Sequence, residues 1–340
     1  MAIRIAVAGI GVRGRAWVRE IRASPAFELV ACVDVDREAF ERASQILEIP
    51  ARKHFFDLDR ALVETCCEAV VVATPAECHF ANCETALSRS VAVLVEKPFT
   101  LGLKEANRLV LLAESKAVPL LVAQNYRYLR SFRTVRRLIG EGKLGQVGMV
   151  ICQYYRVPHD MSPSLARSSQ SAMWGVGVHH LDALRYVLRD EVEGVMSDNF
   201  TLPWTQLPPG ASMRALLSFA SGTRAFYSAT YESSGHEFFE CGQEFYARFM
   251  GEHATLHVFQ RWLLLCEKGK LPRIVRRGKR KSTEEQILLQ QLANALLTGS
   301  EADSSGRDNL QTMAVVDACV RSSAEKVWVN PQELLDEHFK

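Results

Sequence analysis

Residues 1–123 alternate short runs of apolar, β-branched residues with longer segments whose apolar residues recur every three or four positions. Such an alternation of strand and helix patterns is typical of a parallel sheet that helices cover on both faces. The predicted strands are residues 3–9, 28–34, 68–74, 91–97 and 119–124, with a weaker one at 53–56. The predicted helices are residues 12–23, 37–47, 77–89 and 102–116. The pattern indicates an α/β, doubly wound domain of the Rossmann type.

The pattern changes from residue 124 onwards. After a segment rich in Ser and Pro, runs of alternating apolar and polar residues predict antiparallel strands with one solvated face. The predicted elements are strands at 213–222, 224–234, 244–251 and 254–259, and an amphipathic helix near 308–323. Residues 124–340 are therefore expected to form an α+β domain with an open, largely antiparallel sheet. A chain of 340 residues also fits two domains better than one.

Composition narrows the classes of function. The net charge of +2 provides no overall attraction to nucleic acid or to an acidic membrane. No apolar run approaches the roughly 20 residues that span a bilayer, and the apolar opening lacks the features of a secretory signal. The nine cysteines include no Cys-x-x-Cys pair, so reduced thiols are expected rather than disulfides or a metal site. We expect a cytoplasmic protein that binds neither nucleic acid nor membrane.

A glycine-rich motif joins the first predicted strand to the first predicted helix. Gly9, Gly11 and Gly14 have the spacing G-x-G-x-x-G, which permits a tight turn, lets the backbone approach a pyrophosphate and allows close packing of helix on strand. Asp34 follows the next strand, 20 residues after Gly14, where its carboxylate would bind ribose hydroxyls and repel a 2′-phosphate. The motif predicts NAD in preference to NADP. The remaining residues of the predicted cofactor loop are Ile10, Val12 and Arg13.

Arg37 stands three residues after Asp34. Its guanidinium could turn towards a 2′-phosphate and so favour NADP. A solvated helix residue is the more ordinary interpretation.

The tripeptide Glu96-Lys97-Pro98 ends the predicted strand 91–97. Open α/β sheets bind ligands at the carboxyl ends of their strands, so Lys97 would direct its ammonium at the nicotinamide and the substrate. The alternative is an ordinary Glu-Lys pair before a turn.

Taken in order, eight short segments resemble the glucose-fructose oxidoreductase / inositol dehydrogenase family. They are GIGVRG, VDVD, ATPAECH, VEKP, QNYRY, EGKLGQV, GVHHLD and SGRDNLQTMAVVDAC, and they span nearly the whole chain. The resemblance implies an NAD(P)-dependent oxidoreductase of sugars, cyclitols or similar polyols, with a second domain that forms a homodimer or homotetramer through its sheet. It also implies roles for Thr74 and Pro75 along the cofactor, His79 in the following helix, Glu96 and Lys97 near the nicotinamide, and Arg127 in the same cleft.

Two adjacent histidines begin a predicted helix over residues 177–188. His180 lies at the edge of the helix's apolar stripe, so a satisfied, partly buried side chain is expected. His179 points the other way, together with Asp182, and is available for chemistry. Adjacent helical residues diverge by about 100°, which makes a metal site from these side chains geometrically poor.

In the resembled family this motif reads Asp-x-Gly-x-His-x-x-Asp, and its histidine exchanges a proton with the substrate hydroxyl. This chain has Gly177, His179 and Asp182, but Gly175 stands where the first aspartate would be. A carboxylate partner would raise the pKa of the imidazole and fix its tautomer. His179 must therefore rely on Lys97, on Asp182 or on a residue from elsewhere.

Together with this resemblance, the residues predict hydride transfer between nicotinamide and a secondary alcohol or ketone. His179 is the expected acid/base and Lys97 the cation that polarises the substrate oxygen, or the reverse, with Arg127 and Asp182 lining the substrate site. Two alternatives stay open. One is a redox-inactive, NAD-binding sensor or regulatory protein, and the other is an NAD-assisted glycosidase or epimerase with no net redox turnover.

A basic run at residues 268–282 carries eight Lys and Arg in fifteen positions. Such a run can bind nucleic acid or a phosphorylated ligand. It contains no aromatic residue that could stack on bases, so a solvated loop or hairpin is the favoured interpretation.

Overall fold

The computed structural model describes residues 2–158, 161, 163–233, 244–259, 262–278 and 281–338. The chain divides into two compact units, and each consists of two segments. Unit 1 comprises Met1–Asn125 and Lys281–Met313, and unit 2 comprises Tyr126–Arg280 and Ala314–Lys340. The sequence predicts instead that residues 281–313 belong to the second domain. The structure places them in unit 1, because the helix α9 (Glu284–Thr298) packs against α1 (Val12–Ala23).

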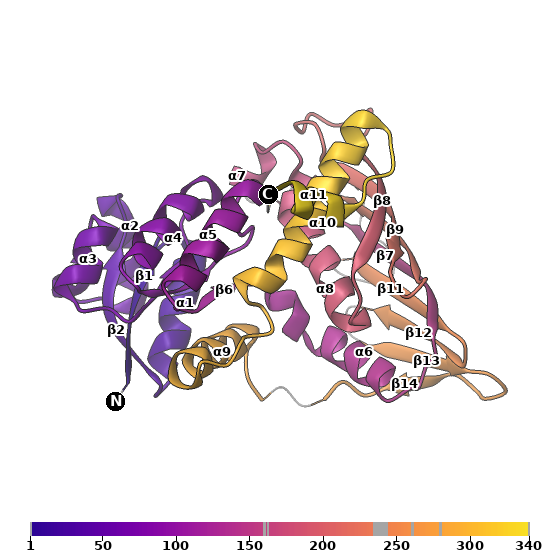
Figure 1. Cartoon of the computed structure of the whole chain (residues 1–340), viewed down its shortest axis with the longest axis horizontal. Coiled ribbons are helices and arrows are strands. Elements are labelled where there is room, and N and C mark those ends of the chain that lie inside the picture. The colour runs from indigo at the N-terminus through magenta and orange to yellow at the C-terminus, as the bar shows by residue number, and fades with distance from the viewer. Residues whose placement is uncertain are drawn as a thin grey trace. The chain divides into compact units, whose positions relative to one another are not determined.

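The described part of unit 1 contains a six-stranded sheet in the order β3-β2-β1-β4-β5-β6, drawn in indigo to purple in Figure 1. Its strands are β1 (Ile3–Ala8), β2 (Phe27–Val33), β3 (His54–Phe55), β4 (Ala69–Val72), β5 (Ala92–Val95) and β6 (Leu120–Val122). All neighbouring strands are parallel. The order reverses between β1 and β4, which is the point where a doubly wound sheet opens a crevice for a ligand. The predicted fold class and all six strand positions are confirmed.

Within residues 1–123, the helices follow the predicted pattern with one addition. The predicted helices appear as α1, α2 (Arg37–Leu47), α4 (His79–Ser88) and α5 (Leu103–Ser115). The helix α3 (Leu58–Glu64) is not predicted from the sequence, because seven residues are too few to show a helical period. Asp57 caps it by accepting a hydrogen bond from Arg60 N at 2.7 Å.

The described residues of unit 2 form an eight-stranded sheet in the order β14-β13-β12-β11-β7-β10-β9-β8. Its strands are β7 (Val147–Tyr155), β8 (Val192–Phe200), β9 (Ser212–Phe219), β10 (Arg224–Thr230), β11 (Glu244–Gly251), β12 (Ala254–Phe259), β13 (Leu263–Glu267) and β14 (Arg273–Val275). The pair β7 and β10 is parallel, and the other neighbours are antiparallel. The prediction of a largely antiparallel sheet is confirmed.

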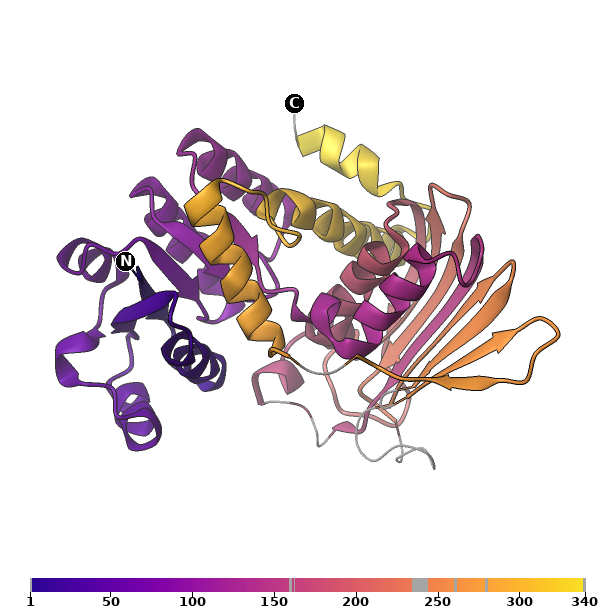
Figure 2. The same cartoon turned by 90° about the horizontal axis from the view of Figure 1, so that it is seen from below.

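Helices lie against one face of this sheet in Figures 1 and 2, and no described helix of unit 2 lies on the other face. The covering elements include α6 (Arg130–Gly140), α8 (Val178–Leu188), the second half of α10 (Gly306–Glu325) and α11 (Pro331–His338), and the short α7 (Pro163–Ala166) precedes α8. Burial alternates along β9 and β10. Along each of these strands, every second side chain therefore packs in the core, and the side chains between them face the uncovered side of the sheet.

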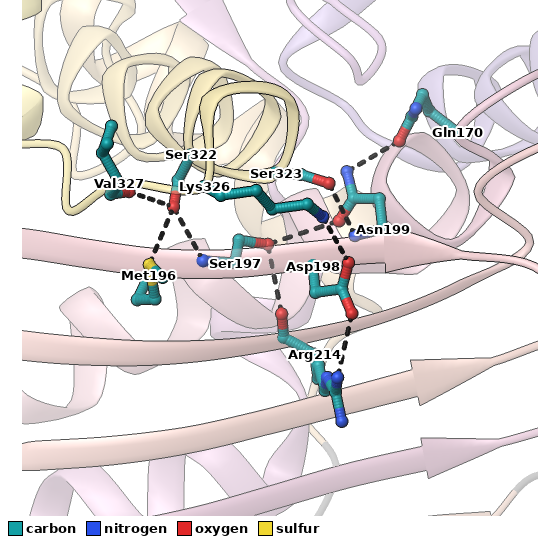
Figure 3. Close-up of polar contacts among 10 residues, drawn as sticks. All are labelled: Gln170, Met196, Ser197, Asp198, Asn199, Arg214, Ser322, Ser323, Lys326 and Val327. Atoms are coloured by element: carbon teal, nitrogen blue, oxygen red, sulfur yellow. Dashed lines mark hydrogen bonds and ion pairs between the residues drawn. The ribbon is translucent and has the colours of Figure 1, made fainter.

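Side chains at the end of α10 form hydrogen bonds with the backbone of the edge strand β8 (Figure 3). Ser322 Oγ accepts a hydrogen bond from Ser197 N at 2.9 Å, and Ser323 Oγ accepts one from Asn199 N at 2.8 Å. Lys326 Nζ lies 2.9 Å from Asp198 Oδ1. The two serine hydroxyls occupy backbone donors that an exposed edge strand would otherwise offer to another chain.

The described part of the basic run forms the turn after β13, the strand β14 and the residues that follow it. Lys270 and Arg273 lie 3.0 and 3.1 Å from carboxylate oxygens of Glu267, which agrees with the interpretation as a solvated hairpin. Residues 279 and 280 of the run lie outside the described residues. Within the described chain, no helix is long and apolar enough to cross a membrane.

Candidate functional site

The glycine-rich loop runs from the end of β1 into α1, and its three glycines have different roles. Gly9 has a φ of 83°, and a Cβ on it would lie 2.6 Å from the Ala73 carbonyl oxygen. A Cβ on Gly14 would lie 1.8 Å from the Gly9 carbonyl oxygen. Gly11 is exposed, with no atom within 4 Å of its Cβ position. Two glycines thus permit the turn and the packing, and the third leaves the backbone accessible, as binding of a pyrophosphate requires.

Asp34 is fixed against this loop. Its Oδ2 accepts a hydrogen bond from Ile10 N at 2.9 Å, and its Oδ1 accepts one from Asp36 N at 3.0 Å. A carboxylate oxygen can accept more than one hydrogen bond, so Asp34 is placed to bind ribose hydroxyls as well. The guanidinium carbon of Arg37 lies 4.8 Å from the centre of the Phe56 ring. This contact agrees with the ordinary surface interpretation of Arg37.

His79 holds together the loops that follow β4 and β5. Its ring is buried, with Nδ1 at 2.7 Å from the Pro98 carbonyl oxygen and Nε2 at 3.0 Å from the Thr74 carbonyl oxygen. Asn82 Nδ2 donates to Thr74 Oγ1 at 3.1 Å, and Pro75 is exposed beside it. The structure therefore shows His79 as a support for the loops, and its contact with the cofactor stays a prediction.

Glu96 points towards α1. Its side chain is buried, and Oε1 accepts hydrogen bonds from Trp17 Nε1 at 2.9 Å and Arg13 Nε at 2.7 Å. Arg13 also pairs with Glu285 of α9 at 3.1 Å. The cofactor loop, the end of β5 and α9 are thus joined through one guanidinium. The roles of Trp17 and Glu285 are not predictable from the sequence, because no spacing pattern links residues so far apart in the chain.

Lys97 stands just beyond the carboxyl end of β5 and is half-buried. Burial lowers the pKa of this amine from 10.5 to about 8, although the negative charge of Glu96 opposes that shift. An amine with such a pKa exchanges protons near neutral pH more readily than an ordinary lysine. Lys97 is therefore suited to act on a substrate oxygen.

In unit 2, a π-helical turn (Met173–Gly177) leads into α8. His179 is 5% exposed, and its ring stacks on Tyr126 with 4.1 Å between centroids and 8° between planes. His180 is fully buried, with Nδ1 at 3.0 Å from Tyr227 Oη. Burial lowers the pKa of His180 to about 3, so this imidazole is neutral at physiological pH. The two histidines have different neighbours but are both buried, and the role in proton transfer stays a prediction for His179.

Arg127 and Asp182 bind each other. Arg127 Nε and Nη2 donate to Asp182 Oδ2 and Oδ1, both at 2.6 Å, and both side chains are almost completely buried. The pair connects the 3₁₀ turn Asn125–Tyr128 to α8. Their predicted contact with substrate stays a prediction, and what the structure shows is a bidentate ion pair that holds the helix of His179. Among the described residues, no group of three or more His, Cys, Asp and Glu side chains is arranged to hold a metal ion.

Known proteins match both units. Residues 3–124 match the model described as oxidoreductase family, NAD-binding Rossmann fold, and residues 132–269 match the GFO/IDH/MocA C-terminal domain. D-apiose dehydrogenase of Paraburkholderia graminis is 26% identical over 94% of this chain and 87% of its own. Inositol 2-dehydrogenase of Rhizobium meliloti is 25% identical over 96% of this chain and 98% of its own.

A solved structure shows the same fold. It is an oxidoreductase from Agrobacterium radiobacter in complex with NAD+, L-tartaric acid and magnesium, with a TM-score of 0.88 at 21% identity. The match covers 98% of this chain and 100% of that one. With both domain models matched over most of its length, this chain belongs to the GFO/IDH/MocA family of oxidoreductases, and NAD is the cofactor of its Rossmann domain.

Proposed function

We propose that this NAD-dependent oxidoreductase interconverts a secondary alcohol and a ketone on a sugar, a cyclitol or a related polyol in the cytoplasm. The geometry of the glycine-rich loop carries the cofactor part of the proposal, because the accessible Gly11 and the fixed Asp34 match what a dinucleotide needs. The similarity to D-apiose dehydrogenase and inositol 2-dehydrogenase supports a polyhydroxylated substrate.

In the proposed reaction, the alcohol carbon loses a hydride and the alcohol oxygen loses a proton. NAD, when bound, accepts the hydride. His179 takes the proton, and the Lys97 ammonium polarises the oxygen on which negative charge develops. General acid/base help of this kind is worth about 10²- to 10⁴-fold in rate.

The test combines NAD with a panel of cyclitols, aldoses, keto sugars and phenyl glycosides, and follows NADH absorbance and glycoside release together. We expect NADH formation that Lys97→Met and His179→Asn each reduce by at least about 100-fold. Lys116→Met and His253→Asn alter exposed residues and should leave the rate unchanged.

Two other outcomes would contradict the proposal. Binding of NAD without turnover of any substrate would favour a sensor. Release of aglycone without free NADH would favour an NAD-assisted glycosidase.

We also propose that two or four copies associate through the uncovered face of the unit 2 sheet. Phe226 and Leu216 are exposed there beside a cavity of about 680 Å³, and apolar side chains on an otherwise open sheet favour burial in an interface. Light scattering should show an oligomer that the double variant Leu216→Asp/Phe226→Asp dissociates. Leu271→Asp, in the turn of the β13–β14 hairpin, is the control. A monomeric wild-type chain would contradict this proposal.

A further inference from the structure

Gly175 is a glycine because of its surroundings, not because of its backbone. It lies within the helical turn Met173–Gly177, where any residue could adopt the conformation. A Cβ at this position would lie 2.7 Å from Tyr231 Oη and 2.9 Å from Leu165 Cδ2. Real Cβ atoms do not approach other atoms so closely, so a larger residue at 175 would have to displace Tyr231.

Tyr231 is held firmly at this point. It follows β10, its backbone N donates to the Ala211 carbonyl oxygen at 3.0 Å, and its side chain is buried. Its ring packs edge-on against Tyr154, with 5.9 Å between centroids. Arg156 Nη1 donates in turn to Tyr154 Oη at 3.4 Å. The backbone of Tyr231 is thus held by Ala211 and its ring by Tyr154 of β7, which places the hydroxyl beside Gly175.

Burial raises the pKa of Tyr231 well above its ordinary value, and the neighbouring Tyr154 and Tyr126 add to the effect. The phenol therefore stays protonated and uncharged at physiological pH. Tyr126 is the same residue whose ring stacks on His179. A group of three tyrosines consequently lies around the turn that leads into α8.

Position 175 precedes His179 by four residues, about one turn of helix. A carboxylate projecting from 175 would favour the imidazolium form of a nearby histidine. In this chain, that volume holds a phenol hydroxyl, which can form hydrogen bonds but carries no charge. The Tyr231 hydroxyl thus differs from a carboxylate at position 175 mainly in carrying no charge.

We propose that Tyr231 is a positioning residue for His179, and that its hydroxyl fixes the turn before α8 where an acidic side chain at 175 would otherwise stand. The proposal rests on the proposed role of His179 as acid/base. It explains how His179 can be oriented in a chain that has glycine at position 175.

The first test removes only the hydroxyl. Tyr231→Phe keeps the ring in place, and we expect kcat to fall about tenfold while KM changes by less than about twofold, because a small misplacement of a catalytic group mainly affects the chemical step. Tyr155→Phe, a half-buried tyrosine on the adjacent strand β7, should leave kcat unchanged. A native kcat and pH profile for Tyr231→Phe would overturn the proposal.

The second test exchanges the hydroxyl for a carboxylate. Gly175→Asp alone should lose activity, because the new Cβ collides with Tyr231. The double variant Gly175→Asp/Tyr231→Ala removes the closest of these contacts and leaves only the end of the flexible Leu165 side chain, which can turn aside for the aspartate. It should recover a large part of the wild-type kcat, with the acidic limb of kcat/KM moved to higher pH, since a carboxylate raises the pKa of the histidine. Equal losses in the single and the double variant would overturn the proposal.

A measurement without substrate separates this proposal from the proposed function. The pKa of His179 can be followed by NMR, with its resonances assigned by their loss in His179→Asn. We expect a higher pKa in Gly175→Asp/Tyr231→Ala than in the wild type, and an unchanged value would overturn the positioning role. Full activity of His179→Asn would contradict the proposed function instead, whatever the NMR result.

Discussion

Two nitrogens of Arg13, Nε and Nη2, lie 2.7 Å from the same oxygen of Glu96, although 83 residues separate the two in the chain. This ion pair joins the loop expected to hold the pyrophosphate to the strand end that precedes Lys97. A residue expected to contact the cofactor thus also determines the shape of the loop.

Glu96→Gln should weaken NAD binding by about five- to tenfold, because the amide keeps the shape but loses the charge that holds Arg13. The free energy of unfolding should fall by about 1–2 kcal/mol, less than for a fully buried pair, since Arg13 is partly exposed. Calorimetric titration with NAD and urea unfolding measure the two effects. Glu285 is the other partner of Arg13, so Glu285→Gln is the control and should reduce the affinity for NAD less than Glu96→Gln does.

Asp34→Asn should change the choice of cofactor. The variant loses hydrogen bonds from ribose hydroxyls to a charged acceptor, which are worth about 1.5–3 kcal/mol, so NAD affinity should fall by at least about tenfold. NADP should bind more tightly than to the wild type, because the repulsion of its 2′-phosphate is gone. Asp36→Asn, an exposed partner of Arg42, is the control. Tighter binding of NADP than of NAD by the wild-type protein would contradict the role given to Asp34.

Asp182→Asn should destabilise unit 2 by about 3–5 kcal/mol, because it removes the negative charge from a bidentate ion pair whose two side chains are almost completely buried. The matched control is Glu191→Gln. Glu191 binds Arg185 with the same bidentate geometry but is half-exposed, and Arg185, although buried, also lies 4.0 Å from Asp182, so the loss of Glu191 should cost less than the loss of Asp182. Urea unfolding of both variants gives the comparison, and equal losses would contradict the importance of burial.

Replacing Lys97 should raise the stability of the fold and lower the catalytic activity. Its folded pKa of about 8 lies below the ordinary 10.5, so the unfolded chain binds more protons between these values and stability rises with pH across that window. Lys97→Met should therefore raise the melting temperature more at about pH 7 than at about pH 10. Wild-type kcat should decline above about pH 8, because the Lys97 ammonium loses its proton there. The residual activity of Lys97→Met should show no such decline.

His180 should make the fold sensitive to acid. Its pKa is about 3 in the folded chain, against 6.5 for an ordinary histidine, so stability should fall as the pH drops below about 6.5. His180→Phe keeps an aromatic ring among the neighbouring aromatic side chains and removes the titrating group. Its free energy of unfolding should change less between about pH 7 and pH 5 than that of the wild type. An identical pH dependence in both proteins would contradict a neutral, buried His180.

The sequence by itself determined the features that depend on local patterns. The six strands of unit 1 appear as apolar runs, and the glycine spacing at Gly9, Gly11 and Gly14 identifies the cofactor loop, because both arise from residues close together in the chain. The order of motifs also indicated the family that the domain models confirm.

Only the tertiary structure decided which distant residues meet. No local pattern shows that Arg13 binds Glu96 and Glu285, that Arg127 and Asp182 satisfy each other, or that residues 281–313 pack with unit 1. The same holds for Tyr231 at Gly175: the sequence shows a glycine there, and the fold shows that Tyr231 fills the space beside it. Such contacts depend on strand order and packing, which bring together side chains from separate parts of the chain.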